Sequence, residues 1–213
     1  MTAIIFDLDG TLLDTLEDLK DATNAALAAF GYPPRTQEEI RQFVGNGAAK
    51  LLELAVPTGT DYEPVLAHFR EYYDAHCRIK TGPYPGILDA LAQIGKEYPI
   101  AIVSNKPDSA VKALCADYFP GILAMGEHPG CPRKPAPDMV LKAMAAIGAE
   151  NCVYVGDSEV DIATAKNAGV PCLTVLWGFR DRPDLEQAGA IHFCTHPNEI
   201  TRQIKDILRL DAE

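Results

Sequence analysis

The stretch AIIFDLDGTLLD, residues 3–14, decides the fold of this chain. It begins with an apolar run, Ala3–Phe6, that is typical of a strand buried on both faces of a parallel sheet. The carboxylates of Asp7 and Asp9 follow directly, and ligands of open parallel sheets bind beyond the carboxyl ends of the strands. Asp-Gly also starts turns, so this stretch alone leaves a purely structural interpretation open.

Further short apolar runs predict the rest of the sheet. They are Ile100–Val103, Ile122–Ala124, Cys152–Val155, Leu173–Leu176 and a weaker run around Ile191–Cys194. Helical patterns lie between them, such as Pro137–Ile147 before Gly148 and Asp161–Ala168 before Gly169. Alternating strands and helices predict an α/β fold with a doubly wound parallel sheet.

The interval between the first two predicted strands, residues 15–81, breaks this alternation. It holds four helical patterns and no convincing strand. The segment GPYPG at residues 82–86 then returns the chain to the sheet. We therefore predict a helical cap at 15–81, inserted into a core made of 1–14 and 82–213.

The charge of the chain restricts its partners. There are 30 acidic and 19 basic residues, a net charge of −11, which repels nucleic acid and anionic membranes. No apolar run reaches the roughly 18 residues of a membrane span, and the N-terminus lacks the basic start of a signal peptide. The six cysteines form no C-x-x-C pair, which favours free thiols. We expect a cytoplasmic protein with no nucleic-acid or membrane partner.

Polar side chains follow the other predicted strands. Ser104 and Asn105 come after the second strand, where they can donate hydrogen bonds to a phosphate oxygen or cap a helix. Lys134 stands among turn residues before a helix, where it can neutralise a bound anion or lie in solvent. These residues are candidate anion-binding groups at the edge of the sheet.

The acids Asp157, Glu159 and Asp161 follow the strand at Cys152–Val155. Without compensation, these carboxylates would repel one another and that of Asp7. A divalent cation removes this conflict, and oxygen ligands of this kind suit Mg²⁺. Capping of the following helix by Asp157 or Ser158 is the alternative.

Four motifs occur in an order that resembles the haloacid dehalogenase superfamily of phosphohydrolases. They are D-x-D-G-T at residues 7–11, a strand-end Ser104, Lys-Pro at residues 134–135 and G-D-S-x-x-D at residues 156–161. The resemblance spans nearly the whole chain, because the insertion lies where that family carries its helical cap. It implies a Rossmann-like core and a Mg²⁺-dependent phosphatase.

The resemblance also implies a role for each motif residue. Asp7 would be the nucleophile that forms an aspartyl-phosphate, and Asp9 would protonate the leaving oxygen and then activate water. Ser104 and Lys134 would hold the phosphoryl oxygens. Mg²⁺ would be bound by Asp7, the carbonyl of Asp9 and Asp157, with Asp161 supporting the metal site through water or hydrogen bonds.

Within the superfamily, the segment RQFVGNGA at residues 41–48 is similar to the cap loop of the phosphoglycolate phosphatase group. This resemblance implies a small phosphorylated carboxylic acid as substrate, with 2-phosphoglycolate as the best single candidate. The basic residues Arg41 and Lys50 flank Gly45–Ala48 and can pair with a substrate carboxylate or remain in solvent. The predicted substrate-binding residues are Gly10, Thr11, Asn105, Arg41, Gly47 and Ala48.

Other functions compete with this interpretation. A sugar-phosphate mutase, or a phosphatase of another small metabolite, would use the same scaffold. A dehalogenase is disfavoured, because its chemistry needs no metal and this chain keeps both Asp9 and Asp157. A regulatory phosphate-binding module would be expected to lose a motif residue, and none is lost. The sequence leaves monomer and homodimer open.

Overall fold

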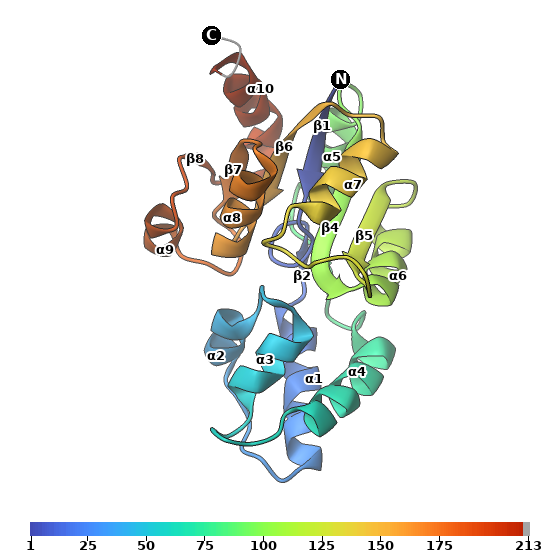
Figure 1. Ribbon diagram of the computed structural model, residues 1–213, viewed down its shortest axis with the longest axis vertical. Helices are drawn as coiled ribbons and strands as arrows, with labels where there is room; N and C mark the ends of the chain where they lie inside the picture. The colour runs from blue at the N-terminus through green and yellow to red at the C-terminus, as the bar shows by residue number, and fades with distance from the viewer. Residues whose placement is uncertain (211–213) are drawn as a thin grey trace.

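The computed structural model of the chain describes residues 1–210. Its centre is a six-stranded parallel sheet with the order β5-β4-β1-β6-β7-β8 (Figure 1). The strands are β1 Thr2–Phe6, β4 Ile100–Pro107, β5 Leu123–Glu127, β6 Asn151–Gly156, β7 Cys172–Val175 and β8 His192–Cys194. Because β1 lies between β4 and β6, the strand order reverses at the end of β1, where ligands of doubly wound sheets bind. The predicted α/β fold is confirmed.

Helices cover both faces of the sheet because successive residues of β1 point to opposite sides. Ile4 and Phe6 share an apolar cluster with residues of α5, α6 and α10, whereas Ala3 and Ile5 share one with residues of α7 and α8. The helices of this part are α5 Ile87–Ile94, α6 Asp108–Tyr118, α7 Asp138–Ala146, α8 Glu159–Ala168, α9 Arg182–Gln187, the 3-10 turn Pro197–Glu199 and α10 Ile200–Leu210. Burial on both faces explains why the strands are apolar without interruption.

Four helices form the cap: α1 Leu16–Ala29, α2 Gln37–Phe43, α3 Gly47–Ala55 and α4 Glu63–His76. They pack around their own apolar core, which includes Leu27, Ile40, Leu52 and Phe69. Figure 1 shows them below the sheet, at the end where β1 leads into β2. The two connecting segments pair as a short antiparallel ribbon, β2 Leu13–Asp14 and β3 Gly82–Pro83. The inserted helical cap is confirmed, while its limits at 15 and 81 as a separable domain stay a prediction.

Strand β4 runs four residues beyond the predicted end at Val103. Ser104, Asn105 and Lys106 are polar, yet they are only 2%, 4% and 6% exposed. Pro107 resumes the pairing with β5 after a shift in register. An apolar pattern does not detect this segment, because its buried polar side chains are stabilised by polar partners between sheet and cap.

Two further expectations concern the whole chain. All six cysteines have free thiols, and five of them are buried, in agreement with the prediction. Among residues 1–210, the helices are all too short or too polar to cross a membrane.

Asp18 of α1 fixes the segment through which the chain leaves the cap. Its carboxylate accepts hydrogen bonds of 2.9 to 3.1 Å from the backbone N–H groups of Ile79, Lys80 and Thr81. The Asp18 residue is only 5% exposed, so these bonds are largely shielded from water. One buried carboxylate therefore joins the first cap helix to the returning chain.

Replacing Asp18 with Ala should lower the free energy of unfolding by about 2–3 kcal/mol, because three backbone donors lose a charged acceptor at a buried position. Urea unfolding followed by circular dichroism measures the loss. Asp21→Ala is the matched control, since Asp21 is a neighbouring acid that is more exposed and pairs with the Lys80 ammonium. The control should lose less than about 1 kcal/mol. Equal losses in the two variants would contradict this account of Asp18.

Candidate active site

A pocket lies between the cap and the ends of β1, β4 and β6. The sheet side of its lining includes Asp7, Asp9, Ser104, Lys134 and Asp157. The cap side consists mainly of apolar residues and a glycine-containing loop: Leu19, Val44, Gly45, Gly47, Ala48, Leu51, Phe69 and Tyr73. The fold thus brings together motif residues that lie far apart in the sequence.

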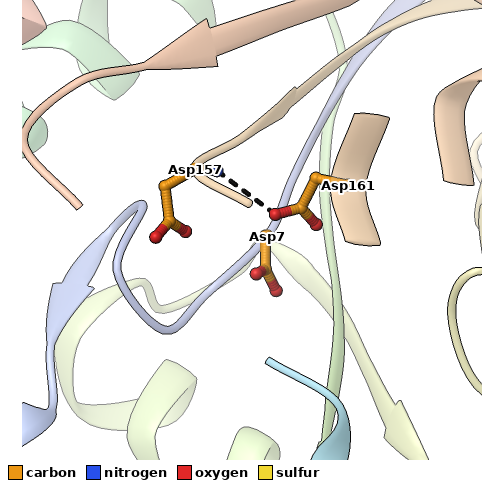
Figure 2. A group of neighbouring side chains, drawn as sticks. All are labelled: Asp7, Asp157 and Asp161. Carbon is orange, nitrogen blue, oxygen red and sulfur yellow. Dashed lines mark hydrogen bonds between the residues drawn. The ribbon is translucent and has the colours of Figure 1, made fainter. Parts of the chain in front are cut away.

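Asp7, Asp157 and Asp161 form a buried acidic cluster, in which each offers a carboxylate oxygen within 4.8 Å of the others (Figure 2). Asp7 follows β1, Asp157 follows β6, and Asp161 lies in the first turn of α8. Burial, with a further contribution from the charge of Asp161, raises the pKa of Asp7 well above its ordinary range. The same two causes raise the pKa of Asp157 to about 7. Three bare carboxylates are therefore costly at this position.

Lys134 compensates part of this negative charge. Its Nζ lies 2.8 Å from Oδ1 of Asp7 and 2.8 Å from Oδ1 of Asp161, and it donates a hydrogen bond of 3.0 Å to the hydroxyl of Tyr154. Burial lowers the pKa of Lys134, but the carboxylates of Asp161 and Asp7 outweigh this effect, so the pKa is raised. The lysine stays charged at neutral pH, and one cation faces three acids.

Protein groups engage both carboxylate oxygens of Asp161. Oδ1 accepts hydrogen bonds from Lys134 and from the Tyr154 hydroxyl. Oδ2 accepts one of 2.6 Å from Ser158 Oγ and two from the backbone N–H groups of Asp157 and Ser158; Figure 2 draws the bond from Asp157. These contacts suit the supporting role that the sequence assigns to Asp161 in the metal site.

The carboxylates of Asp7 and Asp157 suit a divalent cation. Oδ1 of Asp7 is buried and accepts no hydrogen bond, although the Lys134 ammonium is near. Asp157 is held in place through both oxygens, since Oδ1 accepts from Thr11 Oγ1 at 2.9 Å and Oδ2 from the backbone N–H of Phe179 at 2.8 Å. Hard oxygen donors of this kind bind cations such as Mg²⁺. The cluster can therefore hold a metal ion.

Gly10 and Thr11 lie against Asp157 and do not belong to the pocket lining. A Cβ atom on Gly10, whose φ is +80°, would come within 2.4 Å of Asp157 Oδ2. A Cβ atom on Gly178 would meet the same oxygen at 2.4 Å. Gly10 and Thr11, which were predicted to bind substrate, therefore support Asp157 instead, because the turn after β1 packs on the loop after β6.

The cap loop reaches the pocket at the N-terminus of α3. Gly47 and Ala48, both predicted to bind substrate, line the pocket there. The N-cap residue Asn46 makes no side-chain capping bond. Asn105 of β4 also lines the pocket and donates a hydrogen bond of 3.1 Å to the carbonyl of Gly45, which ties the loop to the sheet.

The two basic residues that flank the cap loop do not line the pocket. Arg41 pairs with Asp181 at 2.7 Å, and Lys50 pairs with Glu53 at 2.8 Å. Arg41 was predicted to bind substrate, but the fold places Asp181 beside its guanidinium. The ion pair of Arg41 with Asp181 therefore joins the cap to the loop before α9.

Two cations that line the pocket had no role in the sequence-based prediction. Lys106 Nζ lies 2.9 and 3.0 Å from the two carboxylate oxygens of Asp9. Arg180, in the segment after β7, donates to the carbonyls of Arg41 and Val44 at the end of α2. Both residues follow apolar runs at the carboxyl ends of strands, which is the signal that identified the other site residues.

Known proteins resemble this chain over most of its length. The family model described as haloacid dehalogenase-like hydrolase matches residues 4–175. Phosphoglycolate phosphatase 1 of Pseudomonas aeruginosa is 34% identical over 96% of this chain and 78% of its own length. Phosphoglycolate phosphatase of Cereibacter sphaeroides is 34% identical over 98% of this chain and 100% of its own length. A crystal structure of a protein from Lactobacillus delbrueckii subsp. bulgaricus matches with a TM-score of 0.89 and 39% identity, covering 95% of this chain and 97% of that one.

Without a metal ion, the acidic cluster should make the protein less stable as the pH rises. The pKa of Asp157 is raised from 3.8 to about 7 in the folded chain, so the unfolded chain loses this proton at lower pH than the folded chain does. The free energy of unfolding therefore falls across that pH window. Urea unfolding in a chelator at about pH 5 and about pH 7.5 measures the fall.

Asp157→Asn should reduce this fall, because an amide does not titrate. At the higher pH, Mg²⁺ should raise the Tm of the wild type more than that of Asp157→Asn, since a bound ion stabilises only the folded state. Asp206→Asn, an exposed acid on α10, is the control and should follow the wild type. An equal Mg²⁺ effect on the wild type and Asp157→Asn would show that Asp157 is not part of the metal site.

Proposed function

The chain belongs to the haloacid dehalogenase-like hydrolase family, and we propose that it is a Mg²⁺-dependent phosphatase that hydrolyses small phosphomonoesters, with 2-phosphoglycolate as substrate. The observation that carries the proposal is the position of Asp7. Its carboxylate lies on the pocket wall beside the Lys134 ammonium and within the acidic cluster that can hold a metal ion. A nucleophile, a fixed cation and a metal site therefore meet at one point.

Asp7 acts as the nucleophile in the first step. One of its carboxylate oxygens attacks phosphorus, the bond from phosphorus to the ester oxygen breaks, and the phosphoryl group is carried on Asp7. Attack by a carboxylate on a phosphate anion is opposed by charge repulsion. Lys134 offsets this repulsion, and the Ser104 hydroxyl on the same wall of the pocket can donate a hydrogen bond to a phosphoryl oxygen.

Asp9 moves the protons in both steps. It gives a proton to the leaving ester oxygen, and then takes one from the water that attacks phosphorus and releases Asp7 and phosphate. Asp9 lines the same pocket as Asp7, and its side chain is 14% exposed, so it can meet both the leaving group and water.

Mg²⁺ would be held by Asp7, Asp157 and the carbonyl of Asp9, and when bound it supplies positive charge to the phosphoryl oxygens. Asp161 keeps Lys134 and the loop after β6 in position through its hydrogen bonds. The hydroxyl of Thr11 orients Asp157 in the same way.

Two observations support a small phosphorylated acid as the substrate. Gly47 and Ala48 put the N-terminus of α3 on the pocket, where free backbone N–H groups and the helix dipole favour an anionic group. Two relatives, whose alignments cover 96% and 98% of this chain, are named phosphoglycolate phosphatases. A cytoplasmic location, and a monomer or homodimer without nucleic-acid or membrane partners, complete the proposal.

Replacing the nucleophile and the acid–base residue should have different effects. Asp7→Asn should abolish turnover, because an amide forms no acyl-phosphate and is a poorer metal ligand. Asp9→Asn should lose about 10²- to 10⁴-fold in kcat, because it keeps the nucleophile but lacks proton transfer. With an aryl phosphate, whose leaving group needs little protonation, the Asp9 variant should accumulate phosphoenzyme. Mass spectrometry after rapid quench detects the adduct, and an adduct on a residue other than Asp7 would refute the mechanism.

A panel of phosphomonoesters tests the substrate and the metal. The highest kcat/KM should belong to 2-phosphoglycolate, activity should vanish in excess chelator, and Mg²⁺ should restore it. Ca²⁺ should restore it poorly, because its larger and more flexible coordination can occupy both oxygens of Asp7. A much higher kcat/KM for nucleotides or hexose phosphates would exclude the proposed substrate while leaving the phosphatase activity in place. Isomerisation of a sugar phosphate without release of free phosphate would identify a mutase.

A further inference from the structure

We propose that Lys106 and Tyr73 bind the second anionic group of the substrate, and so select phosphate esters with a carboxylate on the ester carbon. Lys106 belongs to the sheet and Tyr73 to cap helix α4, so the two residues form a recognition site across the pocket. The inference deepens the proposed function and rests on it, because it takes Asp9 as the residue that meets the ester oxygen.

Lys106 has donor capacity that the protein does not use. Its side chain is 3% exposed and lines the pocket. In residues 1–210, its Nζ donates hydrogen bonds to the two carboxylate oxygens of Asp9 and lies over the ring of Tyr73. An ammonium group carries three N–H bonds, so at least one remains for a ligand. The carboxylate of a substrate can form a strong, charge-assisted hydrogen bond with such an ammonium.

Tyr73 supplies a second unused donor. In the described part of the chain no group accepts a hydrogen bond from its buried hydroxyl, and the residue is 3% exposed. Burial raises the pKa of Tyr73, so the hydroxyl stays neutral and can donate. Lys106 Nζ lies 4.7 Å from the centroid of the Tyr73 ring, which places both groups in the same part of the pocket. A buried hydroxyl without a partner costs about 1–3 kcal/mol, and a bound ligand would remove that cost.

The other cations of the pocket are already engaged. Lys134 contacts two carboxylates of the acidic cluster and a tyrosine hydroxyl. Arg180 uses its three guanidinium nitrogens on Glu159 and on backbone carbonyls of the cap. Lys134 is thus held within the acidic cluster, where the phosphoryl group binds in the proposed reaction, and Arg180 is held against the cap. Lys106 is the lining cation that contacts Asp9, the residue that meets the ester oxygen in the proposed reaction.

The contact with Asp9 sets the distance between the two anionic groups of the substrate. Asp9 meets the ester oxygen in the proposed reaction, and Lys106 contacts Asp9 directly. A group bound by Lys106 must therefore lie within a few bonds of the ester oxygen. A carboxylate on the ester carbon satisfies this requirement, as in 2-phosphoglycolate. A phosphate ester with a neutral group at that place leaves the free N–H of Lys106 and the hydroxyl of Tyr73 without an anionic partner.

The test compares 2-phosphoglycolate with 2-hydroxyethyl phosphate, which carries a neutral hydroxymethyl group in place of the carboxylate. The measured quantity is the ratio of the two kcat/KM values in the wild type, Lys106→Met, Tyr73→Phe and Lys50→Met. The ratio should fall about 10- to 100-fold in Lys106→Met and about 3- to 10-fold in Tyr73→Phe. Lys50→Met, an exposed cap lysine paired with Glu53, is the matched control and should keep the wild-type ratio.

The ratio separates recognition from positioning. If Lys106 served only to orient Asp9, its loss would slow both substrates by the same factor and leave the ratio unchanged, which would overturn the proposal. Tyr73→Phe keeps the apolar ring, so it tests the hydroxyl even if Lys106→Met fails to fold. A wild type without preference for 2-phosphoglycolate would remove the substrate class and this assignment together. A preference that persists in Lys106→Met or, should that variant not fold, in Tyr73→Phe would overturn the assignment alone.

Discussion

The site depends on the ion pairs that Lys134 makes with Asp7 and Asp161. Nζ of Lys134 lies 2.8 Å from Oδ1 of each of these two residues. It joins the end of β1 to the first turn of α8, and removal of one member of a buried ion pair typically costs about 3–5 kcal/mol. The backbone N–H of Lys134 also donates to Asn105 Oδ1 at 2.7 Å, which ties this group to β4. The ends of β1 and β4 and the start of α8 therefore meet through one residue.

Backbone groups of the cap help to hold it on the sheet. Arg180 and Asn105 donate to carbonyls at the end of α2 and in the loop that follows it, and such contacts do not depend on the side chains of the residues that accept them. The docked cap covers the acidic cluster with an apolar wall. Exclusion of water strengthens every charge interaction inside, which is what chemistry on a phosphate anion requires.

Much of this arrangement could be predicted from the sequence, because strands and their ends can be recognised from short stretches of residues. Strands buried on both faces must be apolar, and ligands bind where such strands end, so Asp7, Ser104 and Asp157 could be placed together. The contact of Lys106 with Asp9 could not be predicted, because the end of a strand places Lys106 at the site but does not indicate which acid its ammonium contacts. Arg41 was assigned to the substrate as a basic residue flanking Gly45–Ala48, and nothing in the sequence indicates that Asp181 lies beside it. Pairings of side chains between sheet and cap are decided by tertiary structure alone.

Phe179 belongs to two parts of the molecule at once. Its side chain is buried in the apolar core of the cap helices, and its backbone N–H donates to Asp157 Oδ2. Undocking the cap takes apolar contacts away from the same residue that orients Asp157, which is a metal ligand in the proposed function. If Asp157 binds the cation as proposed, cation affinity and cap docking are thermodynamically linked, and linkage is reciprocal. Any factor by which the docked cap tightens cation binding is also the factor by which the cation favours docking.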